Sequence, residues 1–231
     1  MRIAHLVCVY PPYGGGMGAV AQQYAGMLAA EHEVTVFTPH YPGRPIPQTS
    51  GNIKIENLFS WGHMGNAAFL PQLASRLKKF DIVHLHYPFF GVQEWLTWAL
   101  PSTVKLVITY HMQATAGGLK GLLFKAGLAF TNHRLARRAD VLTASTQDYI
   151  NTVALSAMGG VGKWQVVPFA VEDEFTPGLV PKYLTEKLSV PSHTPMILFV
   201  GSMDTAHAFK GVSILLLALK KIQDKSWQVV V

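Results

Sequence analysis

A glycine-rich stretch follows the first apolar segment of the chain and leads into a helical pattern. It reads Pro-Pro-Tyr-Gly-Gly-Gly-Met-Gly over residues 11–18. Glycines let a backbone approach a ligand closely, and the N-terminus of a helix offers free N–H groups and a partial positive charge. The stretch therefore predicts a phosphate-binding turn. A plain Gly-rich turn between a strand and a helix is the alternative.

The same stretch also fits the dinucleotide fingerprint, because Gly16, Gly18 and Ala21 have its spacing. That fingerprint requires glycines directly after the strand and an acidic residue at the end of the second strand. Here Pro-Pro-Tyr intervenes at residues 11–13, and the second apolar segment ends in Thr-Pro-His at residues 38–40. We therefore expect no nicotinamide or flavin cofactor.

Histidines lie at the ends of two further strand-like segments. One residue separates His84 from His86, so the two-residue period of a strand places both imidazoles on one face. They are either a metal pair, for which the neighbouring sequence offers no third ligand, or packed and hydrogen-bonded histidines. His111 follows the next segment at its carboxyl end, where open α/β sheets bind ligands. It is suited to hydrogen-bond a substrate hydroxyl or a leaving group, or else it is a structural histidine at the sheet rim.

A second apolar segment that ends in glycine, residues 196–201, precedes another helical pattern. Lys210 stands just before that helix, where a lysine can meet a phosphate as a point charge. A solvated surface lysine is the alternative.

Strand-like segments alternate with helical patterns along the whole chain. The expected strands are Ile3–Val9, Glu33–Thr38, Ile53–Leu58, Ile82–Leu85, Lys105–Tyr110, Val141–Ala144, Trp164–Val167, Met196–Val200 and Gln228–Val231. The expected helices are Val20–Ala30, Phe69–Lys79, Leu119–Arg138 and Val212–Ile222. Strands that are rich in Val and Ile and apolar on both sides are typical of a parallel sheet covered on both faces. The alternation predicts an α/β fold with a doubly wound parallel sheet.

A proline-rich stretch over residues 168–195 marks a domain boundary, because five prolines in 28 residues break any regular element. We expect an α/β domain over residues 1–170, a linker over 171–194 and one strand–helix–strand unit over 195–231. Such a unit is below the roughly 40 residues at which domains usually need outside help to fold. Because the sequence also stops inside an apolar strand, we expect it to be the front part of a longer two-domain protein.

The composition excludes several classes of protein. With 49% hydrophobic and 14% charged residues, the chain is not intrinsically disordered. A single cysteine, Cys8, excludes an internal disulfide and a thiol-based zinc site. No apolar run reaches the roughly 20 residues of a membrane span, and no signal-peptide pattern is present, so we expect a cytoplasmic protein. Residues 101–140 contain six basic residues and one acidic residue, which accounts for +5 of the net charge of +6. This surface is suited to nucleic acid, anionic lipid or a phosphorylated ligand, or it merely solvates a helix face.

Taken together and in this order, these stretches resemble the family 4 retaining glycosyltransferases of GT-B fold. The matching stretches are YPPYGGGMGAVAQQYAGMLAAEHEVTVFT, DIVHLHYP, VITYH, RRADVLTASTQDY, VVPFAVEDEFTPG and FVGSMDTAHAFKGVSILLLAL. The resemblance implies two facing Rossmann-like domains. The first mostly holds the acceptor, and the second, truncated here, mostly holds a nucleotide sugar.

The resemblance also assigns site residues. It matches Gly15 and Gly16 to the loop that approaches the donor phosphates, and His111 to a catalytic histidine near the transferred sugar. Lys210 matches a basic residue that neutralises the diphosphate. Family members usually have arginine at position 202, so one diphosphate cation is missing here or is replaced by His207. Further donor or acceptor contacts are expected at Gly18, His86, Ser202 and His207. No metal or other cofactor is expected, because this fold usually needs none and the chain has no Asp-x-Asp signature.

The implied activity is transfer of a sugar, with retention, from a UDP- or GDP-linked donor to a lipid or saccharide acceptor in polysaccharide or glycolipid biosynthesis. We expect this of the full-length parent and expect the 231-residue chain alone to be inactive. A non-catalytic acceptor-binding or scaffold module is the alternative, because half of the donor site is missing. No nucleic-acid partner is expected. The basic segment Leu119–Arg138 is expected either to attach the protein peripherally to the inner face of an anionic membrane or to be a core helix.

Overall fold

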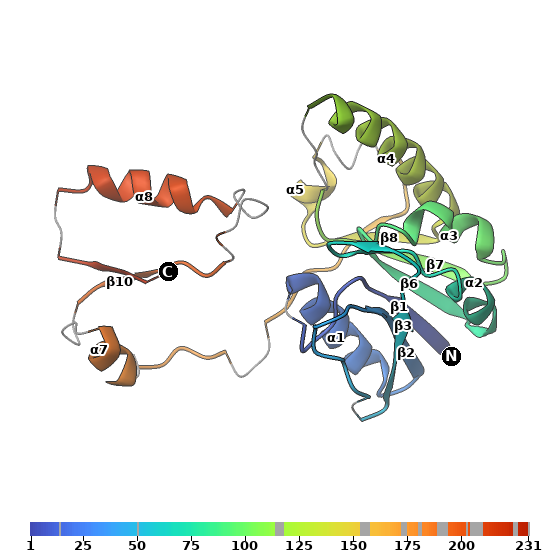
Figure 1. Ribbon diagram of the computed structural model, residues 1–231, viewed down its shortest axis with the longest axis horizontal. Helices are drawn as coiled ribbons and strands as arrows, with labels where there is room; N and C mark the ends of the chain where they lie inside the picture. Colours follow the sequence, from blue (N-terminus) through green and yellow to red (C-terminus); the bar gives the residue numbers. More distant parts are fainter. Residues whose placement is uncertain are drawn as a thin grey trace. The chain divides into compact units, whose positions relative to one another are not determined.

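The computed structural model describes residues 1–13, 15–49, 51–113, 118–152, 158–171, 175–179, 182–188, 194–201, 203, 210–223 and 226–230. The chain divides into two compact units, Met1–Ala170 and Val171–Val231 (Figure 1).

The first unit is built on seven parallel strands in the order β3-β2-β1-β6-β7-β8-β9. They are β1 (Arg2–Leu6), β2 (Glu33–His40), β3 (Ile53–Phe59), β6 (Ile82–Tyr87), β7 (Lys105–Tyr110), β8 (Val141–Ala144) and β9 (Trp164–Val166). Each neighbouring pair is parallel, so all carboxyl ends lie along one edge of the sheet. The predicted α/β parallel sheet is confirmed.

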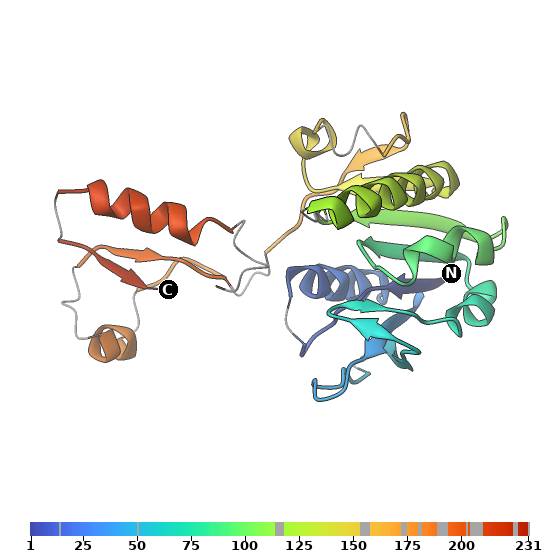
Figure 2. The same cartoon turned by 45° about the horizontal axis from the view of Figure 1, so that its top comes forward.

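Helices cover both faces of this sheet (Figures 1 and 2). They are α1 (Gly16–Leu28), α2 (Leu73–Arg76), a 3-10 helix (Leu77–Lys79), α3 (Gln93–Ala99), α4 (Gly118–Arg138) and α5 (Gln147–Ile150). On one face, Ala21 and Ala25 of α1 pack with Ile3 of β1 in a small hydrophobic cluster. On the other face, a larger cluster includes Leu96 of α3 and Leu135 of α4. The period of two along each strand sorts its side chains between these two layers.

The face toward α1 carries a row of polar side chains where the opposite face is apolar. His5 of β1 stands in register with His84 of β6, and His86 of β6 with Thr109 of β7. Thr109 stands in register with Thr143 of β8. All of these side chains are buried. Because buried polar groups need hydrogen-bond partners, this row must pair within itself or with its neighbours.

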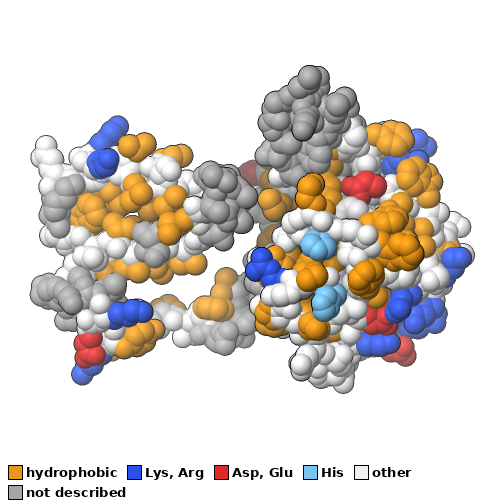
Figure 3. Space-filling model, in the orientation of Figure 1, with side chains coloured by type: hydrophobic (Ala, Val, Ile, Leu, Met, Phe, Trp, Pro, Cys, Tyr) orange, Lys and Arg blue, Asp and Glu red, His pale blue; other side chains and the backbone are white. Residues whose placement is uncertain are grey.

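The second unit contains one strand–helix–strand motif. β10 (Met196–Leu198) and β11 (Gln228–Val230) pair in parallel, and α8 (Val212–Lys221) lies between them in the sequence. Figure 3 shows hydrophobic side chains gathered on this unit, and on α8 Ile214 is 73% and Leu217 60% exposed. The apolar surface of α8 is therefore only partly covered by its own unit.

The expectation that residues 171–194 exclude regular structure is wrong, because α7 (Lys182–Leu188) lies there. No proline occurs inside this helix, and Pro181 stands directly before it. A proline at the start of a helix costs little, since the first N–H groups have no partner within the helix.

Further elements differ from expectation. α3, α5 and the short hairpin of β4 (His63–Met64) and β5 (Ala67–Ala68) were not expected. The helix expected over Phe69–Lys79 begins only at Leu73 and tightens into a 3-10 turn at Leu77. Pro71 accounts for the late start, because proline restricts the residue before it away from helical angles.

The helix expected at Leu119–Arg138 is α4. The side chains of residues 118–126 lie outside the described ones. In the described part of α4, Phe130 is exposed and Leu135 is buried. Among the helices that the structure describes, none combines the length and the hydropathy needed to cross a bilayer.

Candidate active site

The strand order changes direction beside β1. β2 and β3 lie on one side of β1, and β6 to β9 lie on the other side. In open α/β sheets, ligands bind outside the carboxyl ends of the strands at such a switch point. The Gly-rich loop after β1, the loop after β6 and His111 after β7 all leave the sheet at this edge.

The Gly-rich loop ends in the first turn of α1. Gly15 caps the helix with a φ of 154°, and a Cβ there would meet Cγ2 of Val9 at 3.3 Å. A Cβ on Gly16 would have no described atom within 4 Å. The first turn of α1 contains no acidic residue, and its N-cap residue, Gly15, has no side chain to cap it. Unpaired helix N–H groups beside open space are what an anionic group needs.

Gly18 is needed for close backbone packing. A Cβ at this position would lie 2.8 Å from the carbonyl oxygen of Val9 and 3.2 Å from Cα of Tyr10. The backbone of α1 therefore packs directly on the backbone of the loop after β1. This close packing accounts for the glycine without a ligand contact.

Buried contacts join the loop after β1 to its neighbours. Sγ of Cys8 lies 3.7 Å from the carbonyl oxygen of Pro88, after β6, and 3.7 Å from Sδ of Met17 in α1. The hydroxyl of Tyr41 donates to the carbonyl oxygen of Cys8 at 3.0 Å. Burial raises the pKa of the Cys8 thiol to about 12, so this side chain is a packing group rather than a nucleophile.

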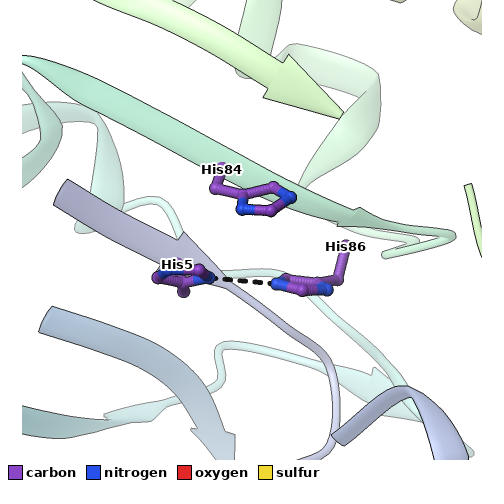
Figure 4. A group of neighbouring side chains, drawn as sticks. All are labelled: His5, His84 and His86. Atoms are coloured by element: carbon purple, nitrogen blue, oxygen red, sulfur yellow. Dashed lines mark hydrogen bonds between the residues drawn. The ribbon is translucent and has the colours of Figure 1, made fainter. Parts of the chain in front are cut away.

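Three histidines form a hydrogen-bonded chain from the interior of the sheet to its carboxyl edge. Nδ1 of His5 lies 3.0 Å from Nε2 of His86, and Nδ1 of His86 lies 2.9 Å from Nε2 of His111. Figure 4 shows the first of these contacts. His5 and His86 are fully buried, so a ligand at this edge could be coupled to His86 only through His111. The half-buried ring of His111 stacks on Phe169 with the centroids 5.0 Å apart.

A second set of hydrogen bonds runs across the sheet beside this chain. Nε2 of His84 lies 2.7 Å from Oγ1 of Thr109, which lies 2.8 Å from Oγ1 of Thr143. The ring of His84 stacks on that of His86 at 4.5 Å between centroids. Tyr24 of α1 stacks on the ring of His84 at 5.9 Å. The ring of His86 is therefore packed as well as hydrogen-bonded.

Burial keeps these imidazoles neutral. It lowers the pKa of His5 and that of His111 from 6.5 to about 4. It also lowers the pKa of His84 and that of His86 well below 6.5, helped by the neighbouring imidazoles. A neutral imidazole has one N–H donor and one acceptor nitrogen, so each ring in the chain can donate once and accept once.

His5, His84 and His86 also form a candidate metal cluster, because one nitrogen from each lies within 4.8 Å of the others. Neutral imidazoles are common metal ligands. A shared ion would have to lie on a lone pair in the plane of each ring, but the rings of His84 and His86 stack at an interplanar angle of 22°. Both nitrogens of His86 also have hydrogen-bond partners already. The geometry favours packed, hydrogen-bonded histidines over a metal site.

The second unit contains the other expected phosphate contact. Lys210 is exposed and directly precedes Gly211, which caps α8 with a φ of 78°. The side chain of Lys210 lies against the backbone that follows β10. A Cβ on Gly201 would lie 2.9 Å from Cδ of Lys210 and 3.4 Å from Nζ of Lys210. The structure thus brings the Gly-ended strand and Lys210 together. Ser202 and His207 lie outside the described residues.

His5 is the site residue that sequence reasoning missed. It is a polar residue in a buried apolar strand and points to the same face as Ile3, toward α1. A histidine at such a position has to find a partner on a neighbouring strand. That requirement is the signal which could have identified it.

Comparisons with known proteins place the chain among glycosyltransferases. Residues 14–174 match the model of Glycosyltransferase Family 4. Over 160 residues, the chain is 28% identical to a D-inositol 3-phosphate glycosyltransferase from Xylanimonas cellulosilytica, a match that covers 63% of this chain and 36% of the relative. The chain therefore spans about a third of the length of this relative.

Two solved structures are similar in fold. A sucrose-phosphate synthase from Thermosynechococcus elongatus matches with a TM-score of 0.66 and 19% identity, covering 96% of this chain and 60% of that one. An E. coli structure described as trehalose-6-phosphate bound with UDP-2-fluoro glucose matches with a TM-score of 0.56 and 14% identity, covering 88% and 57%. The parallel sheet with its helices is the Rossmann-like architecture of the GT-B fold. The match over residues 14–174 shows that the chain belongs to Glycosyltransferase Family 4.

Proposed function

We propose that the protein which contains this chain transfers a sugar from a nucleotide diphosphate sugar to a saccharide or lipid acceptor, with retention of the anomeric configuration. One observation carries the proposal: the N-terminus of α1, with glycine as its N-cap, and the neutral His111 lie at the same edge of the sheet. A departing nucleoside diphosphate develops negative charge, which fixed N–H donors and cations stabilise.

In this proposal, Gly15 and Gly16 let the donor diphosphate approach the first turn of α1. Lys210, in the second unit, is a positive charge of the kind that can contact a phosphate. His111 binds the transferred sugar or the leaving group through Nδ1, because its Nε2 already contacts His86. Transfer proceeds without a metal ion, with these groups doing what a cation would otherwise do at the diphosphate.

The comparisons suggest which substrates to try first. The E. coli structure is described with a UDP-sugar analogue, so UDP-linked donors come before GDP-linked ones. The name of the curated relative contains a phosphorylated inositol, so phosphorylated polyols and sugars join saccharides and lipid-linked saccharides as acceptors. We also propose a cytoplasmic protein that contacts anionic membrane through α4.

The test is a transfer assay on the natural protein that contains this sequence. Radiolabelled UDP- and GDP-sugars are offered with each acceptor class, and the anomeric configuration of the product is read by proton NMR. Label that moves to an acceptor with the configuration of the donor supports the proposal. Inversion contradicts the retaining mechanism. Acceptor binding by calorimetry without any transfer would instead favour a scaffold or acceptor-binding module.

A further inference from the structure

The chain of His5, His86 and His111 permits only two arrangements of its protons. His86 uses both ring nitrogens, so as a neutral ring it must donate to one neighbour and accept from the other. In the first arrangement each ring has its proton on Nδ1, and the hydrogen bonds run from His5 toward His111. In the second, each proton is on Nε2, and the hydrogen bonds run the opposite way.

The buried end of the chain distinguishes the two arrangements. Nε2 of His5 is buried and has no hydrogen-bond partner among the described residues. In the first arrangement this atom is an unprotonated acceptor, and in the second it is an orphaned N–H donor. Buried N–H groups without a partner are rarer in native structures than under-used acceptors. The first arrangement is therefore favoured, and it places the proton of His111 on Nδ1.

We propose that His86, held from behind by His5, is a positioning residue that fixes the ring and the tautomer of His111, so that His111 presents Nδ1–H to the ligand. The stacked ring of His84 supports the same orientation of His86 from the side. The inference rests on the proposed function in one respect: it takes the ligand of His111 to be a substrate.

A chemical consequence follows for the substrate group that His111 contacts. An imidazole that presents Nδ1–H, with Nε2 accepting from His86, donates a hydrogen bond and has no free nitrogen to act as a general base. Its partner must therefore be an acceptor oxygen, such as a sugar hydroxyl oxygen or an oxygen of the leaving diphosphate. His111 thus recognises an oxygen lone pair and does not remove a proton from the acceptor.

The test reads the tautomers directly in the 231-residue chain. The histidine rings are labelled with nitrogen-15, and long-range proton–nitrogen correlation spectra show which ring nitrogen carries the proton. His111→Asn assigns the His111 signals. The wild-type chain should show the proton on Nδ1 of both His86 and His111. A proton on Nε2 of His111 in the wild-type chain overturns the proposal, and no variant has to fold for this result.

Two substitutions at His86 separate positioning from packing. In His86→Leu the partner of His111 is lost, so His111 should show both tautomers. In His86→Asn the side-chain NH2 stands near the former Nδ1, so the Nδ1–H form of His111 should return. An unchanged tautomer in His86→Leu contradicts a positioning role. His133→Gln, at an exposed histidine of α4, is the control and should leave the His111 signals unchanged.

Activity provides an independent readout in the natural protein. His86→Leu should lower kcat about tenfold with little change in the acceptor KM, which corresponds to one hydrogen bond to an oriented group. His86→Asn should restore most of that loss. The expected tautomers together with no transfer by the wild-type protein would refute the proposed function and leave the positioning role standing. A loss in His86→Leu that His86→Asn does not restore would refute the positioning role.

Discussion

The backbone of Gly18 packs on the carbonyl group of Val9, with 2.8 Å between that oxygen and the place of a Cβ on Gly18. Because the obstructing atom is backbone, it cannot rotate away from an added methyl group. Gly18→Ala should therefore lower the free energy of unfolding by about 1–3 kcal/mol, as overpacking usually does. Chemical denaturation measures the change.

Gly26 provides a matched control in the same helix. A Cβ there would have no described atom within 4 Å, so Gly26→Ala should stabilise the chain by about 0.5–1 kcal/mol through helix propensity. Equal effects of the two substitutions would mean that α1 does not approach the loop as closely as the structure places it.

The buried histidines make stability depend on pH. His5 and His111 have a pKa of about 4 in the folded chain and 6.5 as the ordinary value. Between these values the unfolded chain binds protons that the folded chain does not, so the free energy of unfolding should fall as the pH falls from about 6.5 toward 4. Each such histidine contributes a slope of about 1.4 kcal/mol per pH unit in this window.

Denaturation between pH 7.5 and 6 tests this dependence above the range in which most carboxylates titrate. His5→Asn removes one buried imidazole and should flatten the slope. His133→Gln, at an exposed histidine of α4, is the matched control. A slope that His5→Asn does not change would show that His5 is not neutral and buried in the folded chain.

Lys210→Ala in the natural protein should impair use of the donor more than binding of the acceptor. Hydrogen bonds to charged groups typically contribute about 1.5–3 kcal/mol, so kcat/KM for the donor should fall roughly tenfold or more. Steady-state kinetics with the donor and the acceptor varied separately measure the difference. Lys221→Ala, at the other end of α8, matches the lost charge and should have little effect. Identical kinetics for the two variants would make Lys210 a solvated side chain.

The basic helix α4 should bind anionic vesicles. Each basic residue near such a surface contributes about 1 kcal/mol, so replacing Lys120 and Lys125 by Gln should weaken co-sedimentation, and high salt should abolish it. Lys220 and Lys221 replaced by Gln form a charge-matched control outside α4. Equal sedimentation with neutral and anionic vesicles, or none with either, would leave α4 as a core helix.

The sequence predicted best where the hydrophobic pattern was strongest. β7 (Lys105–Tyr110) and β8 (Val141–Ala144) have the predicted bounds, because both are short apolar runs ended by polar or turn residues. β6 extends to Tyr87, beyond the predicted end at Leu85, because His86 stays in the ladder opposite Thr109. Strand pairing thus extends a segment past the point where its own hydrophobicity ends.

The arrangement of the site was harder to predict than the fold. The sequence placed His84 and His86 on one face and His111 at a strand end, each from its own segment. The contact of His86 with His111 depends on the strand order β1-β6-β7. The contact of His5 with the buried side of His86 depends on the same order. A single sequence shows periodicity within a strand but carries no record of which strands are neighbours. His5 remained hidden for this reason.

The pairing of β1 on both of its sides affects how its backbone amides exchange with solvent. β1 pairs with β2 on one side and β6 on the other, so releasing this strand from the sheet requires both ladders to open. Amides of such a strand exchange mainly through global unfolding, whereas residues at a strand end and its loop exchange through small local openings. We therefore expect the imidazole chain to begin, at His5, in a slowly exchanging strand and to end, at His111, where local opening is easier.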